Sequence, residues 1–208
     1  LINALMNIFD SRNIPVAVTF GNHDSEQGAM SREDLMAYYN TFSCSVSVDD
    51  GEALSGCGTY NIPVLASDSD NVKFNIWVFD SGDYDDNGHY GCVMPDQIEW
   101  YKQTSNALAA ANGGEKVNSV VFQHIIVPEI YDVLEKVNYP TLFAFPRIYS
   151  ENEYYRFDPD NVNYGTLNEK PCPGYENYGQ FDAMVEQGDV LAMFTGHDHT
   201  NAFGVEYN

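Results

Sequence analysis

Four of the five histidines directly follow apolar runs that have the pattern of strands buried on both faces. The four are His23, His124, His197 and His199, which follow the runs at 14–20, 117–123 and 189–195. Open α/β sheets build their sites at the carboxyl ends of strands, and neutral imidazole is the commonest metal-binding side chain. In an extended segment, His197 and His199 point to the same side, about 6–7 Å apart. The pattern therefore predicts a metal site at one edge of a sheet.

Taken singly, the three motifs also have ordinary structural explanations. Gly21-Asn22-His23-Asp24 equally fits a turn after a strand, because Gly and Asn both accept positive φ. A single histidine such as His124 is more often a hydrogen-bonded residue at a strand end than a ligand. His89, in a glycine-containing loop, is expected to be solvated. Convergence of all three strand ends is what favours the metal site.

The elements that must position these residues alternate between strands and helices, which predicts an α/β fold. Expected helices lie at 1–12, from a Ser31/Asp34 capping box to about 40, from Pro95 to Gly113-Gly114, at 128–136 and at 181–188; expected strands lie at 14–20, 59–66, 72–79, 117–123 and 189–195. Between 137 and 179 the periodicity disappears, and a stretch of that length is expected to be functional or an insertion. The tyrosines of 149–178 are expected either to rim the pocket or to form a surface excursion.

Composition excludes several classes of function. The chain has 208 residues, enough for one domain, with 9 basic and 31 acidic residues and a net charge of −22. Such a surface repels a nucleic-acid backbone, and an anionic substrate would need a bound metal to reverse the local field. No apolar run approaches 18 residues, so no membrane span is expected. The four cysteines form no C-x-x-C pair, which disfavours a zinc cluster and leaves free thiols and disulfides both open.

The motif set resembles the calcineurin-like metallophosphoesterases, which include the purple acid phosphatases. The similarity rests on GNHD at 21–24, a lone histidine after a strand, and GHDH at 196–199. It is greatest to a branch with QHI-x-VPE, here 123–129, and DSGDY, here 80–84, and it covers nearly the whole chain.

This resemblance implies a four-layer α/β/β/α sandwich that holds two divalent or mixed-valence metal ions, with Fe, Mn and Zn all suited to the ligands. It assigns Asn22, His124 and His197 to one metal and His199 to the other. Carboxylates, one of them bridging, would supply the remaining ligands. His23 would be the general acid, and Asp24 is the candidate for orienting its imidazole.

The implied activity is hydrolysis of phosphomonoesters or phosphodiesters, with small phosphate esters as substrates and a metal-activated hydroxide as nucleophile. However, the family's Asp-x-His and Gly-Asp-x-x-Asp motifs are not among the 20 residues before Gly21, where Asp10 is the sole acid. We therefore expect residues 1–208 to be a single phosphoesterase domain truncated at its N-terminus and at its C-terminus, a partial sandwich. The alternatives are an inactive fragment of that fold that binds at most one metal, and a mononuclear or structural module of unrelated purpose.

Overall fold

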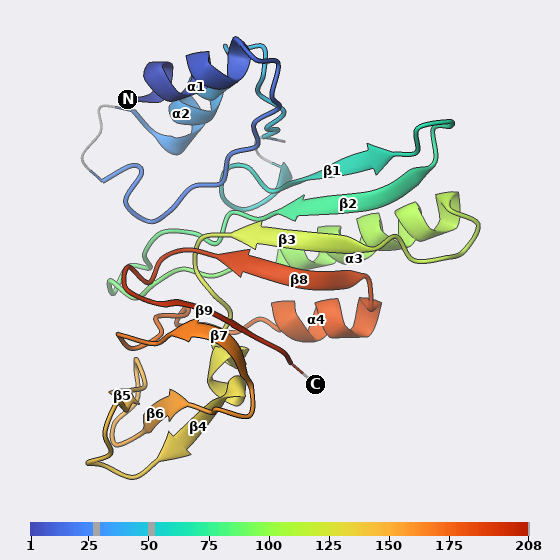
Figure 1. Cartoon of the computed structure of the whole chain (residues 1–208). Coiled ribbons are helices and arrows are strands. Elements are labelled where there is room, and N and C mark those ends of the chain that lie inside the picture. Colours follow the sequence, from blue (N-terminus) through green and yellow to red (C-terminus); the bar gives the residue numbers. More distant parts are fainter. Residues whose placement is uncertain (27–29, 50–52, 208) are drawn as a thin grey trace.

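The computed structural model describes residues 1–26, 30–49 and 53–207. Its centre is a four-stranded sheet in the order β1-β2-β3-β8 (Figure 1). The strands are β1 (Tyr60–Leu65), β2 (Val72–Val78), β3 (Ser119–Gln123) and β8 (Val190–Thr195). β1 pairs antiparallel with β2, whereas β2, β3 and β8 are mutually parallel. The carboxyl ends of the three parallel strands therefore meet at one edge, where His124 follows β3 and the GHDH motif follows β8.

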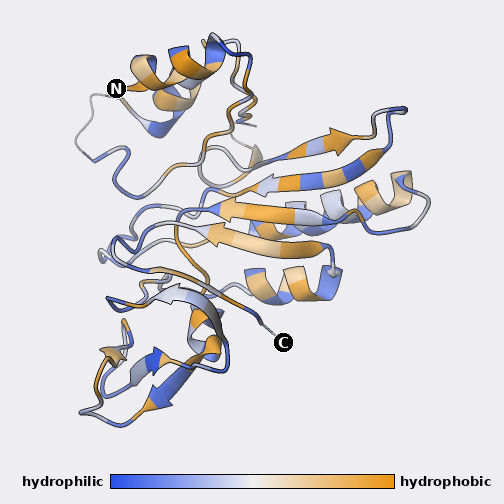
Figure 2. Ribbon diagram, viewed as in Figure 1, coloured by the Kyte–Doolittle hydropathy of each residue, from blue (hydrophilic) through white to orange (hydrophobic). Residues whose placement is uncertain are grey.

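Helices α3 (Pro95–Ala111) and α4 (Gln180–Gln187) cover one face of this sheet. Their side chains enclose Trp77 of β2 and Val121 of β3, both with no exposed surface. Strands β3 and β8 are apolar along most of their length (Figure 2), so apolar side chains also lie on the face that the two helices do not cover. On it Phe122 and Phe194 stack at 5.0 Å and remain 39% and 50% exposed. This mixed α/β architecture confirms the predicted fold class and is consistent with part of a layered metallophosphoesterase sandwich.

The N-terminal part contains α1 (Ile2–Asp10) and α2 (Arg32–Tyr39), and α2 begins at the predicted Ser31 capping box. The predicted strand at 14–20 is wrong. Only Val16 forms a bridge, with Ser45, and the Val18 N–H donates to the hydroxyls of Ser47 and Tyr60. Because side chains satisfy that backbone, the segment runs extended without joining a sheet.

The predicted helix at 128–136 is also wrong in its second half. A 3₁₀ helix, η2 (Pro128–Val133), is followed by β4 (Leu134–Val137), which pairs antiparallel with β6 (Tyr154–Phe157). Burial of Val133, Leu134 and Tyr155 in a shared cluster favours the strand over the helical spacing of the local sequence.

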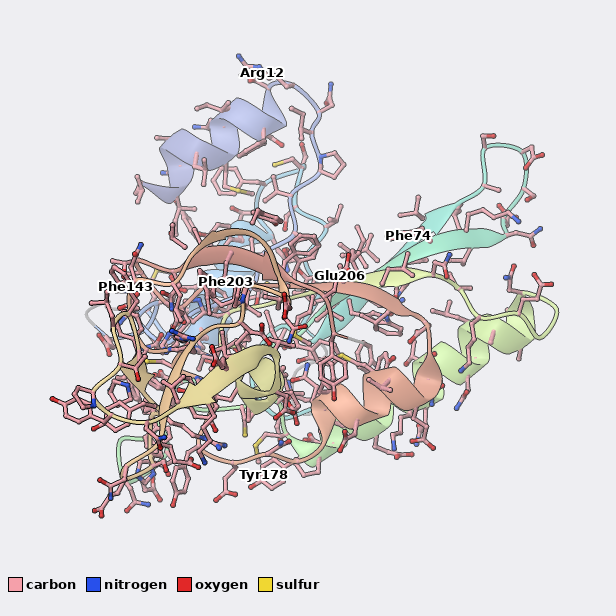
Figure 3. The ribbon with its side chains drawn as sticks, turned by 60° about the horizontal axis from the view of Figure 1, so that its bottom comes forward. Arg12, Phe74, Phe143, Tyr178, Phe203 and Glu206 are labelled. Atoms are coloured by element: carbon pink, nitrogen blue, oxygen red, sulfur yellow. The ribbon has the colours of Figure 1, made fainter. Side chains whose placement is uncertain are left out.

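The aperiodic stretch after 137 also forms strands that local sequence did not predict. They are β5 (Phe145–Pro146), β6 and β7 (Val162–Thr166), and β7 pairs antiparallel with β9 (Ala202–Val205). Figure 3 shows Phe203 of β9 and Phe143, which precedes β5, on the opposite side of the view from Phe74 of β2. This part of the chain therefore forms its own small cluster of strands beside the central sheet.

Candidate metal centre

Three residues from the three motifs converge at the carboxyl edge of the central sheet. The Oδ1 atom of Asn22 lies 3.0 Å from Nε2 of His124, which lies 3.3 Å from Nδ1 of His197. Two donor atoms that each lie 2.0–2.2 Å from one metal ion are separated by about 2.9–3.5 Å in octahedral or tetrahedral geometry. Both distances to His124 Nε2 therefore fit donors of a shared metal ion.

His197 shows two further features of a ligand site. Its Nε2 atom is buried and, among the described residues, has no hydrogen-bond partner. Its backbone has φ of 69°, a left-handed conformation that is uncommon outside glycine and occurs preferentially at functional sites. The edge of the Tyr90 ring contacts the imidazole at 4.3 Å between centroids. The surrounding structure thus holds the ring in a conformation that the backbone alone disfavours.

Two glycines leave the space that the His124 ring occupies. A Cβ atom on Gly21 would lie 2.9 Å from ring atoms Cε1 and Nε2, and one on Gly196 would lie 3.3 Å from Nδ1. Gly21 is therefore required by the close approach of the imidazole rather than by a positive φ. The glycines of GNHD and GHDH position the lone histidine between them.

Burial favours the neutral form of both candidate imidazoles. It lowers the pKa of His124, and it lowers the pKa of His197 to about 4, with the neighbouring imidazoles acting in the same direction. Neutral imidazole is the form that binds a metal. Together with the Asn22 amide, the chain therefore presents three uncharged donors.

His23 and His199 lie beside this triad, with ring centroids 6.3 Å apart. The side chain of His23 is 56% exposed, and its Nδ1 atom lies 2.7 Å from Oε2 of Glu26. The Asp24 carboxylate, the candidate for orienting His23, accepts the Gly21 N–H at 2.7 Å, and the carboxylate in contact with His23 Nδ1 is that of Glu26. Glu26 was not predicted, since an acid three residues after His23 in a loop carries no signal of its own.

Residues of the DSGDY segment hydrogen-bond Asn22 and Arg32. The Asn22 Nδ2 donates to the Tyr84 hydroxyl at 2.6 Å. Asp80, which is buried, accepts from Arg32, whose guanidinium also donates to the carbonyls of Gly21 and Gly82. Arg32 thereby ties the GNHD loop to the DSGDY loop. Sequence reasoning missed it, because nothing in the spacing links α2 to either motif.

The acidic side chains near the motifs make hydrogen bonds to other parts of the chain. Asp198, between the two histidines of GHDH, accepts from the Cys172 N–H and the Asn201 amide, so it faces away from them. Asp10 accepts from Ser43 and Cys44 at the end of α1. Within 1–26, 30–49 and 53–207, no three His, Cys, Asp or Glu side chains form a metal-binding group. Since one of the three donors described above is an amide, that set is not of this kind.

The tyrosine-rich segment lies against these loops. The Tyr175 N–H donates to the Tyr90 carbonyl, and a cavity of about 260 Å³ is lined by Tyr84, Tyr90 and Tyr175. The expectation that His89 is simply solvated is not met. Its ring stacks on Tyr175 at 4.0 Å between centroids, and it pairs with Asp85. The position of the segment agrees with a rim beside the candidate centre.

Comparison with known proteins agrees with this geometry. Probable inactive purple acid phosphatase 14 of Arabidopsis thaliana is 29% identical over 212 residues, which cover 93% of this chain and 47% of that protein. Probable inactive purple acid phosphatase 29 of the same plant is 26% identical over 219 residues, 97% of this chain and 50% of that protein. The chain is purple acid phosphatase-like.

This purple acid phosphatase-like chain spans about half the length of the curated relatives that it matches. A third relative, probable inactive purple acid phosphatase 28 of the same plant, is 25% identical over 91% of the chain. The names of all three relatives contain the word inactive. No family model and no solved structure matches the chain. In the part of the chain that the structure describes, no helix has the length and apolar character needed to cross a membrane.

Proposed function

We propose that this chain binds a divalent metal ion through Asn22 Oδ1, His124 Nε2 and His197 Nδ1, and that the complete protein hydrolyses small phosphate esters. The observation that carries this proposal is the approach of the three donors to 3.0 and 3.3 Å from three separate motifs. The depressed pKa of His197 supports it, because the neutral imidazole is the form that binds a metal.

His199 is proposed to bind the second metal of a dinuclear centre, as the family resemblance implies. When bound, two ions of Fe, Mn or Zn would supply an activated hydroxide and neutralise charge on the phosphate. Of the chain's own groups, His23 is placed to donate a proton to the leaving oxygen, because its ring is exposed and held through Nδ1 by Glu26. Residues 1–208 would form a single domain in this role.

The test uses the full-length protein, purified without chelator and analysed for metal content and for metal-dependent release of phosphate from p-nitrophenyl phosphate. We expect His197→Ala to lose both the metal and the hydrolysis. His89→Ala is the matched control, because His89 pairs with Asp85 on another loop, and it is expected to keep both. Hydrolysis that persists unchanged in His197→Ala would contradict the proposal.

A second candidate is a non-catalytic protein that binds one metal at the same three donors. The names of the relatives, which call them probable inactive phosphatases, favour it. The same experiment separates the two candidates. Two metal ions per protein with turnover support the phosphoesterase, whereas one ion without turnover supports the binding protein.

A further inference from the structure

The tyrosine-lined cavity of about 260 Å³ lies directly beside the candidate metal centre. Two of its lining residues contact the proposed ligands. The Tyr84 hydroxyl accepts from the Asn22 amide at 2.6 Å, and the Tyr90 ring lies 4.3 Å from that of His197 between centroids. The volume is below the roughly 300–1,000 Å³ of pockets that hold drug-sized ligands, so the cavity fits a small organic group.

The wall of this cavity is largely aromatic and is not covered by other side chains. Tyr84, Tyr175 and Tyr178 line it and are 40%, 48% and 45% exposed. The Tyr175 ring is held in place by stacking on His89 at 4.0 Å and by an edge contact with Tyr149 at 5.1 Å. Because the ring is already held, a ligand that contacts it does not bear the entropy cost of ordering it.

The same wall carries an excess of negative charge. Asp80, Asp83, Asp85 and Glu176 line the cavity, and among the described residues no lysine or arginine lines it. Arg32, behind the wall, pairs with Asp80 and Asp83 at 2.8 and 3.8 Å, and His89 pairs with Asp85. Even with His89 protonated, four carboxylates therefore face two cations.

Hydrogen bonds keep one of these carboxylates ionised. The N–H groups of His89 and Asn87 both donate to Asp85 at 2.8 Å, and these bonds, that of His89 foremost, lower the pKa of Asp85 to about 2. Glu176 is exposed at the rim of the same wall.

Aromatic rings combined with surplus carboxylates distinguish three kinds of organic group. An anionic group is repelled, and a neutral group gains only the burial of its apolar surface. A cation is attracted both to the ring faces and to the carboxylates. A quaternary ammonium group gains most, because its methyl groups pack on the rings and it has no N–H that must find a hydrogen-bond partner.

We propose that this cavity binds the quaternary ammonium group of an amino-alcohol phosphate, of which phosphocholine is an example, while the phosphate lies at the candidate metal centre. The inference rests on the proposed function and names its substrate class. In the reaction water adds to phosphorus, and the bond from phosphorus to the ester oxygen breaks. That oxygen takes a proton, for which His23 is the proposed donor, so the products are inorganic phosphate and the free amino alcohol.

The first experiment measures binding without metal or turnover. Metal-free full-length protein is titrated with choline and with its neutral isostere, in which a tert-butyl group replaces the trimethylammonium group, and binding is followed by NMR of the ligand methyl signals. We expect choline to bind about 10-fold or more tightly than the isostere.

Tyr175→Leu removes an aromatic ring from the wall but keeps an apolar side chain, and it is expected to lose most of this preference. Tyr175→Phe retains the ring and is expected to keep the preference. Tyr139→Leu, at a site 72% exposed outside the residues that line the cavity, is the matched control and is expected to bind both probes as the wild type does.

Glu176→Gln provides a variant of nearly unchanged shape at an exposed position, where the fold does not depend on the side chain. It is expected to weaken choline binding about 2- to 5-fold and to leave binding of the neutral isostere unchanged, because only the charge is removed.

The second experiment measures hydrolysis by the metal-loaded full-length protein, with phosphate release from phosphocholine compared with release from the phosphate ester of the neutral isostere. We expect kcat/KM to be about 10-fold or more higher for phosphocholine. Tyr175→Leu is expected to bring the ratio of the two values close to one.

Equal affinity for choline and its neutral isostere, or equal kcat/KM for the two esters, would overturn the ammonium site while leaving the phosphoesterase intact. A preference for choline that Tyr175→Leu leaves unchanged would overturn the assignment to this cavity. Choline binding without hydrolysis of either ester would instead overturn the proposed function, and with it the substrate class.

Discussion

Gly21→Ala is the substitution that most sharply tests how the fold positions the candidate ligands. The new Cβ would lie 2.9 Å from two atoms of the His124 ring, whereas ordinary contacts begin at 3.4 Å. The ring must therefore retreat by about 0.5 Å, the difference between these distances, and metal–ligand distances are held to about 0.2 Å. Since φ of Gly21 is not in the left-handed region, the backbone itself accepts alanine.

We expect Gly21→Ala to weaken metal binding about 10- to 100-fold, or about 1.4–2.8 kcal/mol, the range for disturbed ligand geometry. Overpacking should also lower the free energy of unfolding by about 1–3 kcal/mol. Zinc or cobalt titration by calorimetry measures the first effect, and urea denaturation without metal measures the second.

Gly196→Ala is the graded comparison, because its Cβ would approach His124 Nδ1 only to 3.3 Å. A shift of about 0.1 Å relieves that contact, which lies within the tolerance of a metal site. The Gly196 variant should therefore bind metal more tightly than the Gly21 variant. Wild-type affinity in Gly21→Ala, or equal losses in both variants, would refute the steric reasoning.

Three further substitutions or treatments probe the scaffold around the site. Tyr101→Phe removes a buried hydrogen bond to the Asp189 carboxylate and should lower the free energy of unfolding by about 1.5–3 kcal/mol in urea denaturation, without changing metal affinity. Arg32→Met leaves the buried Asp80 carboxylate without its cation and should cost about 3–5 kcal/mol by the same measurement; a loss under 1 kcal/mol would contradict the assigned ion pair. Burial and the nearby Asp49 raise the pKa of Cys57 to about 12, so iodoacetamide at pH 8 should label Cys57 only after denaturation, as mass spectrometry would show.

Much of the central sheet could be predicted from sequence because its signals are local. The continuous apolar runs located β3 and β8, although their second face, with Phe122 and Phe194, is exposed rather than buried as predicted. Helical spacing with Pro95 located α3. The Ser31 capping box located the start of α2. Each of these signals lies within a dozen residues, where backbone preference and burial agree.

The errors occurred where distant partners decide the structure. The segment at 14–20 has the composition of a strand, yet its Val18 N–H is satisfied by Ser47 and Tyr60 rather than by a neighbouring strand. Likewise β7 pairs with β9, about 40 residues further along the chain, and neither segment is long or periodic enough to predict the pairing.

In the candidate site, too, some features could be predicted from the sequence and others could not. The convergence of Asn22, His124 and His197 was predictable because each follows an apolar run, although only the runs before His124 and His197 are strands of the central sheet. The supporting contacts of Glu26 and Tyr84 were not, because hydrogen bonds between loops depend on how the loops are placed in three dimensions. The sequence therefore indicated the proposed ligands, whereas the contacts that support them could be identified only from the structure.

The most direct test of the central proposal is a crystal structure of the full-length protein grown with cobalt, with anomalous data collected at the cobalt edge. The account predicts an anomalous peak about 2.0–2.2 Å from Asn22 Oδ1, His124 Nε2 and His197 Nδ1 together. An anomalous map with no peak at these three atoms, or with cobalt bound only elsewhere, would contradict it.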